Sequence, residues 1–254
     1  MKYLLSSVAV VALALSISSG ARAQSEITLL SPDPIKATIE KLLQGFEAQT
    51  GTQVRVTYGT GVSTRKTVAS GQALDVSLLF APFAEALKTG NIVPGSATVI
   101  ARLRLALAVQ KGAPKPDIST PEAVKRTLLN AKSIISVDPT QGSVGGIALL
   151  ALDKLGITDQ VKPKIKWVQN GGLVQDSVAK GETEIALGPY LSDMRNPGLD
   201  VVGALPPEAS TPVDITGFLS TSVKDSKAAK ALLAYLSSHE VAPVYEAAKI
   251  FPAH

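Results

Sequence analysis

The residues EITLLSPDPIKATIEKLLQGFEAQTGTQVRVTY, at positions 26–58, decide the fold class. A short apolar run predicts a strand over 26–30, and the apolar residues that follow recur every three or four positions, as on one face of a helix. Asp33 and Pro34 supply an N-cap and a first-turn proline for that helix. A second strand is expected over 53–58. This strand–helix–strand order predicts a parallel sheet with helices packed on its faces.

The alternation of apolar runs and helical segments continues along the chain and forms two series of similar size. Two such series predict two lobes, and we expect the chain to cross between them near 104–106 and near 205–213. The further strands expected lie over 75–80, 98–110, 133–137, 165–168, 184–187 and 213–222. The further helices expected lie over 143–155, 172–180, 226–237 and 241–249 and after residues 63, 82 and 121.

The first 23 residues have the composition of a cleaved export signal. Lys2 gives a positive start, residues 4–17 are apolar but short for a membrane span, and Ala21-Arg22-Ala23 has the small-x-small form of a cleavage site. We expect a mature periplasmic chain that begins at Gln24 and does not insert into the membrane; a retained anchor is the alternative. The expected domains are a signal peptide over 1–23, a first lobe over 24–105 and 208–254, and a second lobe over 106–207.

Composition excludes several classes of protein. Hydrophobic residues make up 45% of the chain and charged residues 18%, which is typical of a globular protein and not of a disordered one. The chain has no cysteine and two histidines, so a disulfide scaffold and a zinc–thiolate site are excluded. The 25 Lys and Arg residues are scattered among 21 Asp and Glu residues without a basic run, so nucleic acid is not an expected partner.

Four expected strand-to-helix junctions combine small or turn-forming residues with hydroxyl, carboxyl or amide side chains. In open α/β folds such junctions lie at the carboxyl ends of the strands, where the first N–H groups of each helix favour an anion. Two sets of junctions that face each other across a cleft would bind a small anion without a full counter-charge. The alternative is that each junction only caps its helix. The four junctions are Ser31–Asp33, Gly59–Thr64, Gln141–Ser143 and Asn170–Gly172.

Several motifs lie at or beside these junctions: Ser31 after the first strand, Ser63 in the second helix, GQALDV at 71–76, Asp138-Pro139 before Gly142-Ser143, and Leu155-Gly156. With these motifs the mature chain resembles the molybdate-binding protein family, among the periplasmic solute-binding proteins of ABC importers. The resemblance implies the α/β, type 2 periplasmic-binding-protein fold. In that fold two lobes, each a mostly parallel sheet flanked by helices, are joined by crossover strands.

The resemblance also implies where a ligand would be held. Carried over by position, the hydroxyl groups of the first lobe fall on Ser31 and Ser63, and the backbone donors of the second lobe fall near Val144 and Gly171. The family's binding tyrosine aligns with Pro189, so that Tyr190 comes one position late.

Two departures from the family pattern change the expected ligand. Arg65 stands beside the Ser63 junction, where it suits bidentate recognition of a carboxylate, and Phe80 could pack on an organic body. These residues favour a small organic carboxylate, with a molybdate-like oxyanion as the family's alternative; a solvated Arg65 and a core Phe80 are the structural alternatives. The expected ligand-binding residues are Ser31, Thr60, Gly61, Ser63, Thr64, Arg65, Phe80, Gly142, Ser143, Val144, Gly171, Gly172 and Tyr190.

Catalysis is not expected from the motifs present. Ser63–Lys66 fits S-x-x-K and Lys88–Gly90 fits K-T-G, but Ser192–Met194 is not S-D-N and follows both, so the pattern of exported serine hydrolases fails. Neither His239 nor His254 has a nucleophile or metal ligand nearby in sequence. We therefore expect no enzyme, no cofactor and no metal, with a hydrolase that uses Ser63 as a minor alternative.

The expected partners follow from the same resemblance. A small anion would bind between the lobes of a monomer and favour their closed arrangement, which then docks on the permease of an ABC importer. Delivery to a chemoreceptor or sensor is the alternative, because it would use the same residues.

Overall fold

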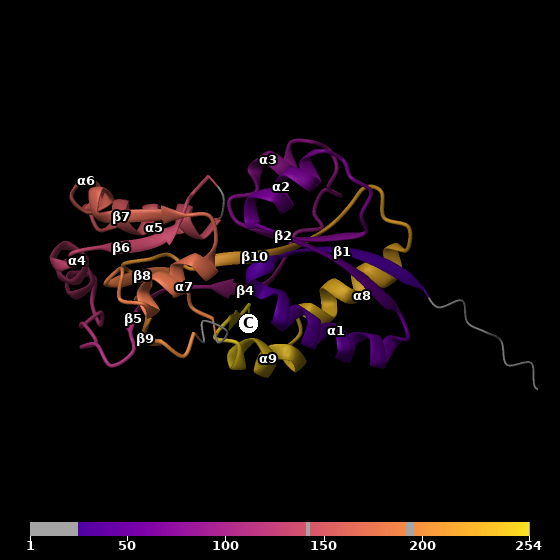
Figure 1. The fold of residues 1–254 in the computed structure, drawn as a ribbon. Coiled ribbons are helices and arrows are strands. Elements are labelled where there is room, and N and C mark those ends of the chain that lie inside the picture. Colours follow the sequence, from indigo (N-terminus) through magenta and orange to yellow (C-terminus); the bar gives the residue numbers. More distant parts are fainter. Residues whose placement is uncertain (1–24, 141–142, 192–195, 254) are drawn as a thin grey trace, which may run out of the picture.

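The computed structural model describes residues 25–140, 143–191 and 196–253, so the expected signal peptide and Gly142 lie outside the described residues. Figure 1 shows two lobes side by side, each built on its own β-sheet. We call the lobe with the six-stranded sheet the first lobe and the lobe with the five-stranded sheet the second lobe. This arrangement agrees with the expected two-lobe α/β fold.

The first lobe is a mixed sheet. Its strand β1 pairs in parallel with β2 and β3, whereas β10 runs antiparallel between β3 and β4, and β11 closes the edge beside β4. In the order of the sheet, the strands are β11 (Phe251–Pro252), β4 (Thr98–Leu103), β10 (Val213–Leu219), β3 (Val76–Phe80), β1 (Glu26–Pro32) and β2 (Gln53–Gly59).

Helices cover both faces of this sheet. In Figure 1, α2 and α3 lie on one face, and α1, α8 and α9 lie on the other. The chain leaves α1 through Gly51, whose φ of 71° is the left-handed conformation that ends helices and that glycine adopts without strain. The helices are η1 (Asp33–Ile35), α1 (Lys36–Thr50), α2 (Gly61–Ala69), α3 (Ala84–Leu87), α8 (Ser226–Leu236), η3 (His239–Val241) and α9 (Ala242–Ala247).

The second lobe repeats this plan with five strands. Its β6 pairs in parallel with β7 and β8, and β5 runs antiparallel between β8 and β9. In the order of the sheet, the strands are β7 (Ile165–Val168), β6 (Ile134–Val137), β8 (Ile185–Pro189), β5 (Leu105–Gln110) and β9 (Leu199–Ala204). The helices are α4 (Pro121–Asn130), α5 (Ser143–Lys154), α6 (Thr158–Val161), η2 (Lys162–Lys164) and α7 (Gly171–Ala179).

The structure refines the expected fold in three places. The run 98–110, predicted as one strand, is two strands of different sheets that meet at Arg104. Strand β9 was not predicted, because its short run contains Asp200 and Gly203 and becomes a strand by pairing with β5. Both sheets are mixed, whereas mostly parallel sheets were expected, because the strands on either side of each crossover run antiparallel to a neighbour in their own sheet.

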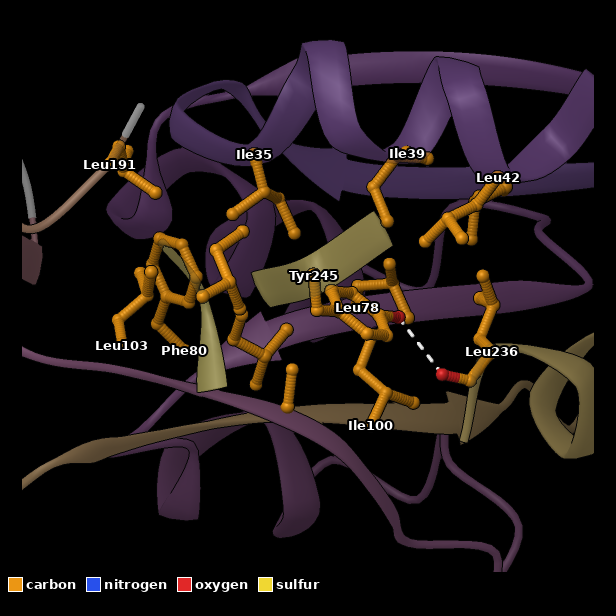
Figure 2. Close-up of a cluster of buried hydrophobic side chains, with 14 of the residues drawn as sticks. Ile35, Ile39, Leu42, Leu78, Phe80, Ile100, Leu103, Leu191, Leu236 and Tyr245 are labelled. Carbon is orange, nitrogen blue, oxygen red and sulfur yellow. Dashed lines mark hydrogen bonds between the residues drawn. The ribbon is translucent and has the colours of Figure 1, made fainter. Parts of the chain in front are cut away.

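The core of the first lobe is mostly aliphatic, as the low aromatic content predicts. Ile39 and Leu42 of α1 point toward Leu78 of β3 and Tyr245 of α9, and all four side chains are buried (Figure 2). The hydroxyl of Tyr245 donates a hydrogen bond of 2.9 Å to the backbone oxygen of Leu236. Burial raises the pKa of this hydroxyl, so it stays protonated and continues to donate.

Arg104 holds the two crossover segments together. Its guanidinium donates a 2.7 Å hydrogen bond to the backbone oxygen of Leu205, the first residue after β9, and lies 5.0 Å from the ring centroid of Phe251. Its own backbone oxygen accepts a 2.7 Å hydrogen bond from the N–H of Tyr190. One residue therefore ties the first crossover to the second, to the C-terminal strand and to the end of β8.

Asp75 joins β1, β3 and α8 at the far end of the first lobe. Its carboxylate, 3% exposed, accepts hydrogen bonds from the N–H and hydroxyl of Thr28, each 2.8 Å long, and from the N–H of Lys224 at 2.7 Å. Burial by itself raises the pKa of Asp75, but these hydrogen bonds and the Lys224 charge outweigh it, so the pKa lies below its ordinary value.

We expect Asp75→Asn to lower the free energy of unfolding at pH 7 by about 1–3 kcal/mol, because an amide cannot accept all three hydrogen bonds. A lowered carboxyl pKa stabilises the fold above its unfolded value of about 3.9, and this contribution is lost as the pH falls through the folded value. Urea unfolding at pH 7 and at several values below 4 measures both effects. The variant should lose less stability than the parent on acidification, whereas the exposed Glu246→Gln should behave as the parent. Equal acid sensitivity of Asp75→Asn and the parent would contradict this assignment.

We expect Arg104→Ala to lower the free energy of unfolding by about 1–3 kcal/mol, because it removes both the hydrogen bond to Leu205 and the contact with Phe251. The matched control is Arg55→Ala, since Arg55 makes an exposed ion pair with Glu26 that contributes at most about 1 kcal/mol. Thermal and urea unfolding compare the two variants. If Arg104→Ala loses no more stability than Arg55→Ala, the contacts of Arg104 at the crossovers contribute little to the free energy of unfolding.

Candidate functional site

A cavity of about 260 Å³ lies between the lobes and takes walls from both of them. The first lobe supplies the start of η1, the start of α2 and the end of β3. The second lobe supplies the ends of β6 and β8 and the starts of α5 and α7. The lining residues are Asp33, Pro34, Thr60, Gly61, Phe80, Val137, Ser143, Val144, Gln169, Asn170, Gly171, Gly172, Val174, Gln175, Leu187, Gly188, Pro189 and Leu191.

Three helix N-termini meet at this cavity: α2 at Gly61, α5 at Ser143 and α7 at Gly171. The side chain of Thr60 accepts a hydrogen bond from the N–H of Ser63 at 3.0 Å, and that of Asn170 accepts one from Leu173 at 3.1 Å. These caps leave the first two N–H groups of α2 and α7 without an intrahelical acceptor. The cavity therefore presents N–H donors and the positive ends of three helix dipoles.

Arg65 adds a positive charge beside these helix termini. Its Nη1 donates a 2.7 Å hydrogen bond to the Oγ of Ser143, so a side chain of α2 reaches the first residue of α5 in the other lobe. Burial lowers the pKa of Arg65 and the charge of Glu85 opposes that effect, and the guanidinium remains protonated because its ordinary pKa is far above neutrality. Arg65 thus places a cation at the edge of the cavity and joins the lobes.

Gly61 allows α2 and α5 to approach each other this closely. A Cβ at this position would overlap the Oγ of Ser143 and lie 3.2 Å from the ring of Phe80. A larger residue at position 61 would therefore push the two helix N-termini apart.

The remaining wall is apolar. Phe80, only 1% exposed, belongs both to the core of the first lobe and to the cavity wall. Val137, Val144, Leu187 and Leu191 continue this surface on the second lobe. The cavity can therefore hold a molecule with both an anionic group and an apolar body.

The structure brings seven of the expected residues together on the cavity wall. They are Thr60, Gly61, Phe80, Ser143, Val144, Gly171 and Gly172. Arg65 reaches the wall through its hydrogen bond to Ser143.

Four other expected residues that the structure describes lie off the wall: Ser31, Ser63, Thr64 and Tyr190. Ser31 is fully buried, and its hydroxyl has no hydrogen-bond partner among the described residues. Ser63 is exposed and donates to the backbone oxygen of Thr60, while Thr64 is buried and donates to that of Gly61. Tyr190 is not on the wall, although both of its neighbours in the chain are.

Sequence reasoning missed several lining residues. Asp33 was expected only as a helix cap, but the helical turn begins at Asp33 itself, after Pro32, and has no side-chain cap. Gln169 and Gln175 lie close to the Asn170 junction in the sequence, and this closeness could have identified them as lining residues. Nothing in the sequence marks Val137, Leu187 and Leu191 as lining residues, because apolar residues of the core occur at the ends of strands as well.

The geometry gives no support to a hydrolase that uses Ser63. The Ser63 hydroxyl is engaged with the Thr60 backbone, and Lys66 of the same motif is exposed. No group of three or more His, Cys, Asp or Glu residues able to hold a metal ion occurs within 25–140, 143–191 and 196–253. None of the helices in that part of the chain has the length and apolar character needed to cross a membrane.

Solved structures with the same fold cover nearly the whole chain. The substrate-binding domain of a putative molybdenum ABC transporter from Clostridium difficile is 16% identical, with a TM-score of 0.75 over 91% of this chain and 100% of that one. The periplasmic molybdate-binding protein of Azotobacter vinelandii is 17% identical, with a TM-score of 0.70 over 90% of this chain and 100% of that one. At these identities the likeness establishes the fold.

Among curated proteins, an aconitate isomerase from Pseudomonas sp. is 28% identical over 233 residues, which are 89% of this chain and 87% of that protein. The family model for bacterial extracellular solute-binding proteins matches residues 27–248. This match includes the sheet of the second lobe, the sheet of the first lobe apart from its edge strand β11, and every wall of the cavity. The chain therefore belongs to the bacterial extracellular solute-binding protein family.

Proposed function

We propose that this protein is exported to the periplasm, captures a small organic carboxylate in the cavity between its lobes and delivers it to a membrane permease. The observation that carries the proposal is the pairing of anion-binding groups with an apolar wall. Arg65 and three helix N-termini supply the charge, and Phe80 with its apolar neighbours supplies a surface for carbon atoms. A bare tetrahedral oxyanion would leave that surface without a partner.

The size of the cavity and one relative support the same ligand class. A volume of about 260 Å³ is just below the range of about 300–1,000 Å³ common for small-molecule sites, which suits a compact ligand. The curated relative is named for aconitate, a carboxylate. We therefore place small di- and tricarboxylates ahead of molybdate and sulfate as ligands of this protein.

Closure of the lobes would allow a permease to detect that a ligand is bound. A ligand that touches α2 of one lobe and α5 and α7 of the other stabilises the arrangement in which these helices are close. In that arrangement a carboxylate would compete with Ser143 for the guanidinium of Arg65. The permease would then distinguish loaded from empty protein by the relative position of the lobes.

A second candidate function is isomerisation of an unsaturated carboxylate in the same cavity. The observation that favours it is the relative named aconitate isomerase, whose similarity extends over 89% of this chain. Groups that hold a carboxylate also stabilise the negative charge that forms when a proton leaves a neighbouring carbon. Binding and isomerisation can therefore share one site.

We expect thermal unfolding of the protein to shift upward with at least one of trans-aconitate, cis-aconitate and citrate. A ligand at about 100 times its Kd adds about 2.7 kcal/mol to the free energy of unfolding. Arg65→Ala should weaken that binding about 10- to 100-fold, because a hydrogen bond to a charged group contributes about 1.5–3 kcal/mol. Lys66→Ala, which removes a positive charge from the next residue of α2, should bind as the parent does.

Molybdate, sulfate and phosphate complete the panel. A shift with molybdate or sulfate alone, unchanged in Arg65→Ala, would contradict the carboxylate assignment. Equal losses in Arg65→Ala and Lys66→Ala would show a general effect of charge and would remove Arg65 from the site.

A further inference from the structure

Asp33 is the one titratable side chain among the described residues that line the cavity. The other polar lining residues are hydroxyl and amide side chains, and the positive charge of Arg65 reaches the wall only through Ser143. Asp33 stands at the end of β1, where the first turn of η1 begins. The cavity therefore combines groups that attract an anion with a single carboxylate.

Asp33 is the acidic residue in the first turn of η1, where a negative charge is favourable, but its exposed side chain makes no contact that holds the fold together. The helical turn begins at Asp33 with Pro32 as the preceding residue, and no side-chain cap is formed. No hydrogen bond or ion pair joins the carboxylate of Asp33 to any residue that the structure describes. Its charge also opposes the binding of an anionic ligand, because like charges at close range repel each other. Asp33 therefore lowers the affinity of the cavity for an anionic ligand. Its presence on the wall is explained if it exchanges a proton with that ligand.

We propose that Asp33 is the proton acceptor and donor for a 1,3-proton shift in an unsaturated di- or tricarboxylate bound in the cavity. This inference rests on the second candidate function. The Asp33 carboxylate takes a proton from the CH₂ group that lies between the double bond and a carboxylate. The C–H electron pair forms a double bond to the central carbon. The electron pair of the former double bond moves toward the neighbouring carboxylate, whose oxygens take the negative charge, and a dienolate results.

Asp33 then gives a proton to the other end of the allyl unit. The C–H bond formed there uses the electron pair of the dienolate, and Asp33 becomes a carboxylate again. The double bond has moved by one carbon, and no oxidant, reductant or metal is consumed. In aconitate, this shift interconverts the two geometric isomers, since the CH₂ and CH carbons on either side of the central carbon exchange roles and the new double bond can form with the other geometry.

The surroundings of Asp33 suit this chemistry. Negative charge builds up on the substrate carboxylate in the dienolate. The starts of α2, α5 and α7 line the cavity that would hold it, and Arg65 lies at its edge, bonded to Ser143. The Asp33 side chain is exposed, so a proton that it carries exchanges with solvent and deuterium can enter the product in D₂O.

The experiment incubates the mature full-length protein with trans-aconitate in D₂O and follows the ligand by proton NMR. The parent should form cis-aconitate and place deuterium on the allylic carbons. Asp33→Asn should lower both rates about 100-fold or more, because a positioned general base contributes about 10²- to 10⁴-fold. Calorimetric affinity for trans-aconitate should be equal or tighter in Asp33→Asn, because a negative charge has been removed. The matched control, Glu40→Gln, removes a carboxylate from the exposed face of α1, where it pairs with Lys36, and should keep the parent's rate and affinity.

The outcomes separate this inference from the proposed function. If the parent binds trans-aconitate but neither isomerises it nor exchanges its protons, the role of Asp33 is overturned and carboxylate capture stands. Turnover by Asp33→Asn at the parent's rate would also overturn it. The protein could instead turn over trans-aconitate without showing equilibrium binding of citrate or of either aconitate isomer. Capture for transport would then fail while the role of Asp33 stands. Absence of both binding and turnover with every carboxylate tested overturns both proposals.

Discussion

Within the part of the chain that the structure describes, the two lobes share no strand, and Arg104 joins the two short crossovers that connect them. Arg104 occupies the single position between β4 and β5, and its guanidinium holds the backbone that follows β9. Its carbonyl oxygen accepts the N–H of Tyr190, whose neighbours Pro189 and Leu191 line the cavity. The crossovers and the cavity wall are therefore connected through one residue, and a ligand that contacts the end of β8 lies close to the crossovers.

Strand direction explains why the anion-binding groups meet at one place. In each lobe the parallel strands end at the edge that faces the other lobe, and helices α2, α5 and α7 begin there. The positive ends of these helices would repel one another in an empty, water-free gap. A bound anion removes that repulsion, and Arg65 together with Ser143 supplies a hydrogen bond across the gap in this structure. Closure and anion binding thus depend on the same groups.

Capture and proton transfer make similar demands on such a cavity. Both need a carboxylate to be held by N–H donors and a cation, and both need water to be kept from the apolar part of the ligand. They differ in one group. A proton shift needs a base in the cavity, whereas capture alone is stronger without a carboxylate there, because a carboxylate repels an anionic ligand. The base that we propose is Asp33 on the wall, which lies within the residues that the family model matches.

The sequence by itself determined the α/β class, most of the order of helices and strands, and the strand-to-helix junctions, among which those at Thr60, Ser143 and Asn170 line the cavity. These features are local, because apolar periodicity and residues such as Thr60, Asn170 and Gly51 act on their own helices. Only the tertiary structure decided that the run 98–110 divides between two sheets and that β9 pairs with β5. It also decided that Arg65 meets Ser143, 78 residues away, while Ser31 and Ser63 stay off the cavity wall. Such contacts depend on the packing of one lobe against the other, and no periodicity along the chain records the direction in which a side chain points across that gap.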